Sequence, residues 1–344
     1  MRERLFSRWR ALLALQVLAI VLLLVPICWQ LYCLYLHHVT RSVNTPAHFG
    51  NGPANIRTAS SGTQDGQDLR FVVAGDSRGY GTFEVLMEEI KILKPEFIVL
   101  VGDIARRGTK GDHLFLQLEM ATEMITDCPV FYVVGNHDIG PAFPISTWEQ
   151  AYGPSQFSFM RGGNLFIVAH IPLDPDQAAK GMQFLEEELQ AKSAGAHRVF
   201  VFNHIPPDFS MGWKNEPLPQ QDKFLALLDH YGVDYLISGH YHGYASVNVG
   251  KLRIIVTGGG GAGLKGGSLG FHHALLMTLR NDTVEERLCS VPAIFALEDR
   301  VESEAIAKAI PFIGQHKLLV GGVNVFILLL LFVLTRRVVR AVRR

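Results

Sequence analysis

The chain has 344 residues, and its 32 basic and 32 acidic side chains give a formal net charge of zero. This length allows one large domain or two small ones. A hydrophobic share of 48% with 19% charged residues is ordinary for a globular protein with added membrane segments. The balanced charge gives no support to nucleic-acid binding, which normally requires a basic surface. The arginines, however, collect at both ends of the chain.

Residues 11–36 form an almost unbroken apolar run that follows a basic N-terminus, residues 1–10. The run exceeds the roughly 20 residues that a helix needs to cross a bilayer. A cleaved signal peptide is the alternative, but its apolar stretch normally has only about 7 to 15 residues and ends near an Ala-x-Ala site. We therefore predict a transmembrane helix over residues 11–36.

A second apolar run covers residues 318–335, between a juxtamembrane segment (293–317) and a basic tail (336–344). A buried helix of a globular domain is the alternative to a second span. Arginines precede the first run and follow the second, so the positive-inside rule predicts cytoplasmic termini and an extracytoplasmic central domain. The sequence does not choose between a bacterial periplasm or exterior and a eukaryotic lumen.

The region between the two runs divides at residue 69. Residues 37–68 are rich in Ser, Thr, Gly, Asn and Pro and predict a linker without regular structure. Residues 69–292 alternate short β-rich runs with amphipathic helical windows, which predicts an α/β domain. The expected strands are 71–74, 97–101, 130–134, 165–169, 199–202, 235–237, 252–256 and 274–279, and the expected helices are 83–93, 114–125, 182–191 and 224–231.

Five short segments place metal-ligand residue types directly after strand-like runs. They are Gly75-Asp76, Gly102-Asp103, Gly135-Asn136-His137-Asp138, Asn203-His204 and Gly239-His240-Tyr241-His242. Carboxylate, amide and imidazole groups suit borderline and hard divalent cations, and a glycine lets the backbone turn so that the next side chain faces a shared cleft. One such segment is common by chance, but five in this order predict a two-metal hydrolytic site.

This pattern resembles the calcineurin-like metallophosphoesterase superfamily, whose motifs run Asp-x-His, Gly-Asp, Gly-Asn-His-Asp/Glu, a single His and Gly-His-x-His. The resemblance covers about residues 69–285 and implies a four-layer α/β/β/α sandwich of two mixed sheets flanked by helices. It also implies six metal ligands: Asp103 between two cations, Asp76 and His242 at the first, and Asn136, His204 and His240 at the second. Manganese, iron, zinc and nickel all suit this mixed set of oxygen and nitrogen ligands.

The resemblance further implies a hydrolytic mechanism. Two cations roughly 3.5 to 4 Å apart lower the pKa of a shared water, so that hydroxide attacks phosphorus in line with the leaving group. His137 directly follows a ligand and should face the substrate, where its ring protonates the leaving alkoxide or stabilises its charge. Asp138 should orient that ring through its second nitrogen.

One position departs from the family pattern, because Arg78 stands where the first motif has histidine. A guanidinium is always protonated and has no lone pair to give a metal. Arg78 either grips a phosphate oxygen beside the metals or serves as an internal counter-charge for Asp76. We favour the first interpretation, since arginine binds phosphate oxygens in a bidentate manner. One or two divalent ions are therefore expected.

Two further features leave alternatives open. The glycine run 258–263 lacks the Gly-Lys-Ser/Thr ending of a Walker loop and predicts a flexible rim of the active site. Cys128 and Cys289 could form a disulfide in an oxidising compartment, although two unpaired thiols are favoured.

Together these features predict a membrane-anchored phosphoesterase that hydrolyses a phosphomonoester or a phosphodiester. Two anchors would hold the cleft near the bilayer, so a lipid-linked phosphate or a glycolipid headgroup is a natural substrate. The alternative is a catalytically impaired family member that binds phosphate ligands or proteins, but the retained Asn136, His137 and Asp138 argue against it. A nuclease is disfavoured by the expected location and by the lack of a basic stripe.

Overall fold

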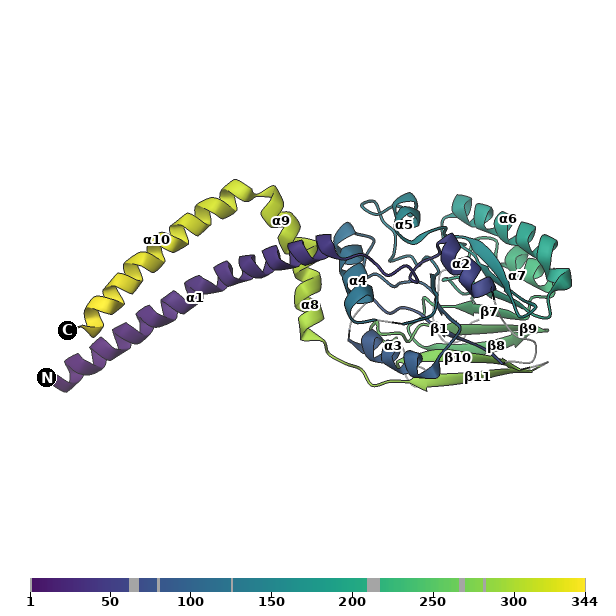
Figure 1. The fold of residues 1–344 in the computed structure, drawn as a ribbon, viewed down its shortest axis with the longest axis horizontal. Helices are drawn as coiled ribbons and strands as arrows, with labels where there is room; N and C mark the ends of the chain where they lie inside the picture. Colours follow the sequence, from purple (N-terminus) through teal and green to yellow (C-terminus); the bar gives the residue numbers. More distant parts are fainter. Residues whose placement is uncertain are drawn as a thin grey trace. The chain divides into compact units, whose positions relative to one another are not determined.

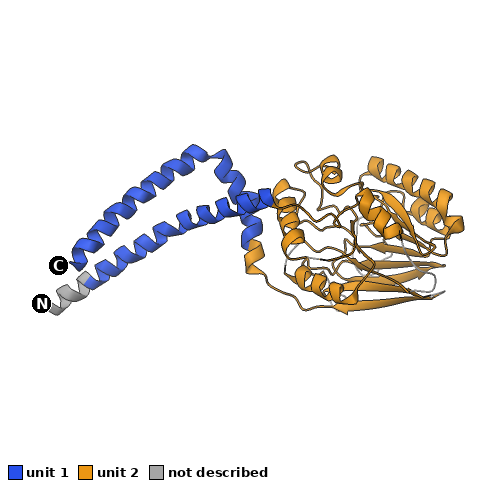
Figure 2. Cartoon of the chain, viewed as in Figure 1, with its two compact units in different colours: residues 1–42, 301–344 blue, residues 43–300 orange. Residues whose placement is uncertain are grey.

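The computed structural model describes residues 2–61, 68–78, 81–124, 126–208, 217–265, 270–280 and 283–343. The chain divides into two compact units (Figure 2). Unit 1 combines residues 1–42 with residues 301–344, and unit 2 comprises residues 43–300. The segments that carry the metal-ligand motifs all belong to unit 2.

Unit 2 is built around two β-sheets (Figure 1). The first has the order β11-β10-β1-β2-β3, with β1, β2 and β3 parallel and with β10 antiparallel to both β1 and β11. Its strands are β1 (Leu69–Ala74), β2 (Phe97–Leu100), β3 (Val130–Tyr132), β10 (His273–Arg280) and β11 (Thr283–Ser290).

The second sheet has the order β4-β5-β6-β7-β9-β8, in which the four central strands are parallel and the two edge strands antiparallel. Its strands are β4 (Phe157–Arg161), β5 (Asn164–Val168), β6 (Val199–Phe202), β7 (Tyr235–Ser238), β8 (Tyr244–Val249) and β9 (Leu252–Thr257). Both sheets are therefore mixed, as expected from the sequence.

Helices cover the outer face of each sheet. The first sheet packs against α3 (Thr82–Leu93), α4 (Lys110–Thr122) and α5 (Ile145–Tyr152), and the second against α6 (Pro175–Lys192) and α7 (Gln221–His230), with the short 3₁₀ turn η1 (Ser193–Gly195) after α6. Strand residues alternate between these layers: Val72 and Ala74 of β1 face helices, whereas Phe71 and Val73 face the other sheet. The α/β/β/α sandwich predicted from the sequence is confirmed.

Phenylalanines fill the space between the sheets. Phe71 of the first sheet meets Phe166 and Phe200 of the second edge-to-face, with ring centroids 5.4 Å apart in both pairs. All three side chains are fully buried. Because burying one such side chain contributes about 2 to 3 kcal/mol, this layer fixes the sheets, and with them the loops at their ends, in one arrangement.

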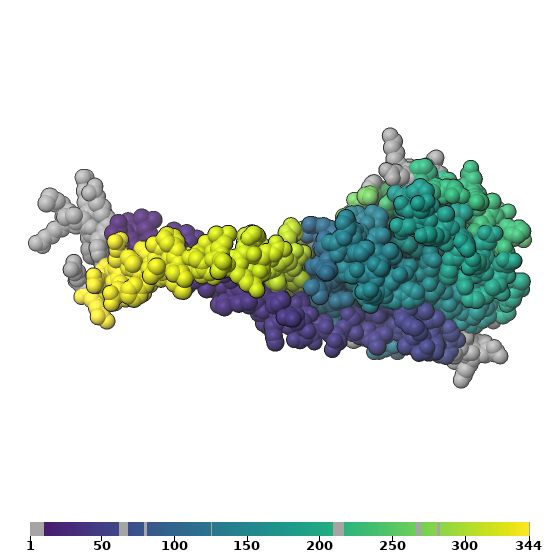
Figure 3. Space-filling view, turned by 90° about the horizontal axis from the view of Figure 1, so that it is seen from above, coloured from purple at the N-terminus to yellow at the C-terminus, as the bar shows by residue number. Residues whose placement is uncertain are grey.

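The predicted linker, residues 37–68, is wrong over most of its described length. Helix α1 (Arg2–Ser42) includes residues 37–42, Phe49 pairs with Val130 as an isolated β-bridge, and α2 (Pro53–Ser60) packs against β4. Figure 3 shows residues 43–61 in indigo against the teal surface of unit 2, to which they belong. The polar composition suggested a linker, but here polar side chains hold the segment in place of apolar packing. Asn51 is fully buried and forms hydrogen bonds with the backbone of β3. Residues 62–67 lie outside the described residues.

Unit 1 consists of helices. The long helices are α1 and α10 (Lys317–Val342), and α8 (Leu297–Glu304), the π-helical turn η3 (Ala305–Ala309) and α9 (Ile310–Gln315) connect unit 2 to α10. Residues 10–42 and 317–342 are long and apolar enough to cross a membrane. They contain the two predicted spans, 11–36 and 318–335.

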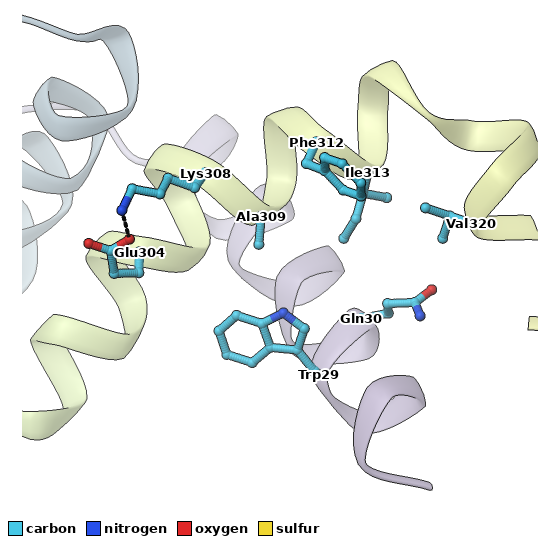
Figure 4. A pocket seen from close by; sticks show the side chains of 8 residues that line it. All are labelled: Trp29, Gln30, Glu304, Lys308, Ala309, Phe312, Ile313 and Val320. Carbon is cyan, nitrogen blue, oxygen red and sulfur yellow. Dashed lines mark ion pairs between the residues drawn. The ribbon is translucent and has the colours of Figure 1, made fainter. Parts of the chain in front are cut away.

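A polar pair joins the two long helices of unit 1. Gln30 Nε2 donates to Asn324 Oδ1 over 3.0 Å, and Asn324 Nδ2 donates to Gln30 Oε1 over 2.7 Å. Next to this pair is a pocket of about 520 Å³, where Trp29 of α1 faces Ala309 and Phe312 (Figure 4). An amide pair between otherwise apolar helices favours one register, because each amide satisfies the hydrogen-bonding groups of the other.

Candidate metal centre

The motif residues meet at the carboxyl ends of parallel strands from both sheets. Asp76, Asp103 and Asn136 follow β1, β2 and β3, whereas His204 follows β6 and His240 follows β7. Asp76, Asp103 and His240 have positive φ values of 56°, 52° and 68°. This conformation is uncommon for residues with a Cβ and is typical of functional sites, where the surrounding structure enforces it.

One half of the site is formed by Asp76, Asp103 and His242, whose ligand atoms lie within 4.8 Å of one another. His242 Nδ1 donates to the carbonyl of Gly263 over 2.6 Å, which leaves Nε2 with a lone pair 3.3 Å from Asp76 Oδ1. That carboxylate oxygen is buried and has no hydrogen-bond partner. An unpaired oxygen facing an imidazole lone pair fits a divalent cation.

The other half is formed by Asp103, Asn136, His204 and His240. His204 Nδ1 donates to the carbonyl of Val101 over 2.8 Å, so Nε2 presents its lone pair 3.1 Å from Asn136 Oδ1 and 3.3 Å from Asp103 Oδ1. His240 Nδ1 lies 2.9 Å from the same Asn136 oxygen. Burial lowers the pKa of His240 to about 4, so its ring is neutral near pH 7. These converging acceptors also fit a cation.

Asp103 lies between the two halves. Its Oδ1 faces His204, whereas its Oδ2 lies 3.8 Å from Arg78 Nη2 and 3.9 Å from His137 Nε2. Burial alone would raise the pKa of this carboxyl, but interactions with the His204 and His137 rings, when these are protonated, and with the Arg78 guanidinium hold the pKa below its ordinary value. For Asp76, burial dominates and raises the pKa. The position of Asp103 agrees with the bridging role that the family resemblance implies.

Glycines allow the backbone to approach these carboxylates closely. A Cβ on Gly135 would lie 2.3 Å from Asp103 Oδ1, and one on Gly258 would lie 2.6 Å from Asp76 Oδ2. The loop that begins at Gly258 is also hydrogen-bonded to the Asp76 loop, since Gly260 N donates to Gly75 O and Ala262 N to Asp76 O, both over 2.7 Å. The glycine run 258–263, predicted to be a flexible rim, is thus a packed wall of the site.

Arg78 reaches the centre. Its Nη2 lies 3.4 Å from His242 Nε2 as well as 3.8 Å from Asp103 Oδ2, and 24% of its side chain is exposed. The carboxylate that Arg78 faces is that of Asp103, whereas one sequence-based alternative placed it beside Asp76. The guanidinium therefore adds a fixed positive charge next to the first half of the site and keeps part of its surface open to solvent.

The structure gives Asp138 a different role from the predicted orientation of the His137 ring. Its Oδ2 accepts from Asp103 N (2.9 Å) and Gly135 N (2.8 Å), and its Oδ1 accepts from Ala105 N (2.8 Å). Both oxygens are thus engaged by backbone donors that join the loops after β2 and β3. His137 remains beside the centre, with 40% of its side chain exposed. Its backbone N–H donates to Asp103 Oδ1 over 2.8 Å. Burial lowers the pKa of His137.

Two supporting residues have roles that the motif reasoning missed. His113 of α4 is buried, and its ring nitrogens lie 2.8 Å from the carbonyl of Asp138 and 2.9 Å from Tyr152 Oη. Asn203 Oδ1 accepts from Ile171 N over 2.9 Å and so fixes the loop that presents His204. Asn203 stands inside a motif and could have been suspected, whereas His113 has no sequence signal. Cys128 and Cys289 are both free thiols in the structure.

Comparisons with known proteins place this geometry in a family. Residues 69–244, more than half of the chain, match the model of the calcineurin-like phosphoesterases. The chain is 30% identical over 223 residues to the serine/threonine-protein phosphatase CPPED1 of Rattus norvegicus, with 58% of this chain and 67% of that protein covered. The Danio rerio protein of the same name is 32% identical over 168 residues, with 43% and 54% covered.

Among solved structures, the purple acid phosphatase PPD1 from yellow lupin seeds superposes with a TM-score of 0.52 at 15% identity, covering 65% of this chain and 52% of that one. At this identity the likeness concerns the fold alone. The chain spans about two thirds or less of the length of these curated relatives. Because the family match extends over both aspartate motifs, the asparagine–histidine motif and the histidines after β6 and β7, the chain belongs to the calcineurin-like phosphoesterases, a family of metal-dependent phosphoric ester hydrolases.

Proposed function

We propose that this chain is a membrane-anchored phosphoesterase that hydrolyses a phosphomonoester or a phosphodiester. The observation that carries the proposal is the position of Asp103: one of its oxygens lies within 4.8 Å of ligand atoms of Asp76 and His242, and its Oδ1 lies 3.3 Å from His204 Nε2. A divalent cation bound there would act as a Lewis acid, making water a better nucleophile near neutral pH and withdrawing charge from the phosphoryl oxygens.

We assign the metal ligands from the acceptor atoms whose lone pairs point toward a common position. Asp76, Asp103 and His242 would hold one ion, and Asp103, Asn136, His204 and His240 a second, so that the centre takes one or two divalent ions. The second group consists of a carboxylate, an amide and two imidazoles that can be neutral, whereas the permanently charged Arg78 Nη2 lies 3.4 Å from a ligand atom of the first. We therefore expect the second group to bind its ion more tightly, with manganese, iron, zinc or nickel as candidates.

Two residues are placed to act on the substrate. Arg78, whose side chain is partly exposed, can donate to a phosphoryl oxygen, and its guanidinium lies 3.8 Å from the Asp103 carboxylate. The half-exposed His137 ring lies beside the same carboxylate and can donate a proton to the leaving alkoxide. Asp138 supports this arrangement by joining the two loops.

Two apolar helices support membrane anchoring. They precede and follow the catalytic unit in sequence, and the Gln30–Asn324 pair lies between them. Arginines outside both spans favour cytoplasmic termini and an extracytoplasmic catalytic unit. A lipid-linked phosphate or glycolipid headgroup is then a suitable substrate, because it is presented at the surface to which the enzyme is tethered.

The second candidate function is binding of a phosphate-bearing ligand or protein without turnover. One observation favours it: Arg78 Nη2 contacts His242 Nε2 and so engages the lone pair that an ion in the first half would need. A single ion and a guanidinium would then hold a phosphate group without hydrolysing it.

The deciding experiment measures turnover of 4-nitrophenyl phosphate and bis(4-nitrophenyl) phosphate by the detergent-solubilised full-length protein, with each candidate metal and with a chelator. We expect metal-dependent hydrolysis that falls by about 10³-fold in Asp103→Asn, because the bridging charge is lost. Asp222→Asn, on the exposed face of α7, is the matched control and should keep full activity. If the folded protein hydrolyses neither these esters nor lipid-linked phosphates with any metal, the binding function is favoured instead.

A further inference from the structure

A second group of carboxyl side chains comes from α3 and α4, on residues that the metal centre does not use. Figure 1 labels both helices. Glu84 comes from the first turn of α3, and Glu119 and Glu123 come from the end of α4. One oxygen of each lies within 4.8 Å of the other two. Glu119 and Glu123 are four residues apart, so they project from the same face of the helix.

One member of this group is buried, and a second is half-buried. Glu119 is only 2% exposed, and its Oε2 has no hydrogen-bond partner. Glu84 Oε1 is also buried and unpartnered. Burial together with the neighbouring carboxylates raises the pKa of Glu119 to about 10 and that of Glu84 to about 7. An isolated buried carboxylate is unfavourable, so the pair needs either a proton or a cation.

We propose that Glu84, Glu119 and Glu123 bind one calcium ion. The group offers carboxylate oxygens only, with neither imidazole nor thiolate, and this composition suits a hard cation. Calcium accepts six to eight oxygens in irregular arrangements and tolerates bidentate carboxylates, whereas magnesium requires a nearly ideal octahedron. Three glutamates from two helices match the calcium preference, because long side chains can adjust around a large ion.

The ion would join α3 to α4 within unit 2. Helix α3 follows the loop with Asp76 and Arg78, and α4 follows the loop with Asp103. Asp299 of α8 accepts from Gly81 N, at the start of α3, over 2.9 Å, and its negative charge raises the pKa of both Glu84 and Glu119. Calcium would relieve the repulsion among these carboxylates. It would thereby stabilise the two helices behind the metal centre and the chain segment that leaves unit 2.

The alternative occupant of the group is a proton. The Glu84 and Glu119 side chains lie within hydrogen-bonding distance of each other, as a carboxyl and a carboxylate would when they share one. The two occupants predict opposite effects of replacing Glu119 by glutamine. A calcium site loses a ligand, whereas a shared proton is replaced by an amide N–H that can donate to the same neighbour.

The test uses the full-length protein in detergent, freed of metal, in the Asp103→Asn background so that the metal centre does not contribute to calcium binding. Equilibrium dialysis should find one calcium ion per chain, and calcium at about 100 times its dissociation constant should raise Tm by about 5 °C. In Glu119→Gln and Glu84→Gln, calcium affinity should fall at least 10-fold and the rise in Tm should disappear. Glu123→Ala, an exposed change that the fold tolerates, should also weaken binding.

The proposal is overturned if the parent protein binds no calcium at millimolar concentration, or if all three variants bind it unchanged. It is equally overturned if Glu119→Gln raises Tm without calcium, because that result identifies the shared proton. Asp222→Asn serves as the control for removing an exposed carboxylate and should leave calcium binding unchanged. Since the readout is calcium binding, its failure leaves the proposed hydrolysis untouched.

Discussion

Arg78 stands where the family motif described above has histidine. Its position in the structure is compatible with both candidate roles, a contact with substrate phosphate and an internal counter-charge. It lies near the Asp103 carboxylate and His242, yet about a quarter of its side chain remains open to solvent. A counter-charge alone needs no exposure. The partial exposure of the side chain therefore supports a contact with substrate phosphate in addition to the contact with Asp103.

Replacing Arg78 separates these roles. We expect Arg78→Ala to lower kcat/KM by about 100-fold, because a charged donor to the phosphoryl group is lost, and Arg78→Lys to recover part of that loss as a point charge without a bidentate contact. The measurement is kcat and KM for an aryl phosphate across a metal titration. If Arg78→Ala instead kept its turnover and only bound metal more tightly, the residue would be a counter-charge and no more.

The site residues differ in how far sequence reasoning could assign them. Asp76, Asp103 and His240 are recognisable because each follows a glycine at a strand end, and His242 because it stands two positions after His240, which are local signals. The role of Asp138 was not predictable in this way. Two of its three backbone donors, Asp103 N and Ala105 N, come from a different loop more than 30 residues earlier in the chain. Its role depends on the alignment of β2 with β3, and a local sequence pattern carries no information about that alignment.

At the scale of elements, the segment before β1 is part of the catalytic unit. Asn51 is fully buried, and its side chain forms three hydrogen bonds to backbone: Nδ2 donates to Tyr132 O (2.8 Å) and Pro154 O (2.9 Å), and Oδ1 accepts from Tyr132 N (2.8 Å). It thus satisfies the end of β3, an edge strand that would otherwise expose these groups.

We expect Asn51→Ala to destabilise unit 2 by about 2 to 4 kcal/mol, because buried backbone groups lose their partners. Denaturant unfolding of the full-length protein, followed by near-ultraviolet circular dichroism, measures this change. Thr58→Ala, on the exposed side of α2, is the control and should shift stability by less than about 0.5 kcal/mol. An unchanged denaturation midpoint in Asn51→Ala would mean that the segment does not stabilise unit 2, as expected for the linker predicted from the sequence.

The elements that sequence reasoning missed share a physical cause. All eight strands predicted from apolar runs are present, because strands packed on both faces are apolar along their length. Strand β11 has mostly exposed or half-exposed residues, and β8 is exposed at its end, so neither shows a continuous run. Helix α2 is missed for a similar reason, since only Asn55 and Ala59 of it are buried.

At the scale of the molecule, His273 connects the two sheets at the edge of the metal centre. It is fully buried at the start of β10 in the first sheet, and its Nδ1 donates to Phe271 O over 2.8 Å. Its Nε2 accepts from Thr257 Oγ1 over 3.1 Å, at the end of β9 in the second sheet. The ring therefore joins the sheets as a neutral group, and burial lowers its pKa to about 4.

This arrangement predicts a pH-dependent contribution of His273 to stability. In the unfolded chain the ring has a pKa near 6.5, so between pH 6.5 and 4 the unfolded state binds the extra proton and stability falls as the pH falls. The buried carboxyls with raised pKa values, Glu84 and Glu119, act in the opposite direction. The contribution of the histidine must therefore be measured as a difference between wild type and His273→Gln, in which the carboxyls cancel.

We expect the free-energy difference of unfolding, wild type minus His273→Gln, to be constant above about pH 7 and to decrease by about 1.4 kcal/mol per pH unit below pH 6.5. Urea unfolding of the full-length protein at pH 7.5, 6 and 5 provides the values. His230→Gln, at the exposed end of α7, should show no such slope. A free-energy difference that does not change with pH would mean that the buried His273 ring accepts a proton without moving. The contact between the sheets would then not require the neutral form of the ring.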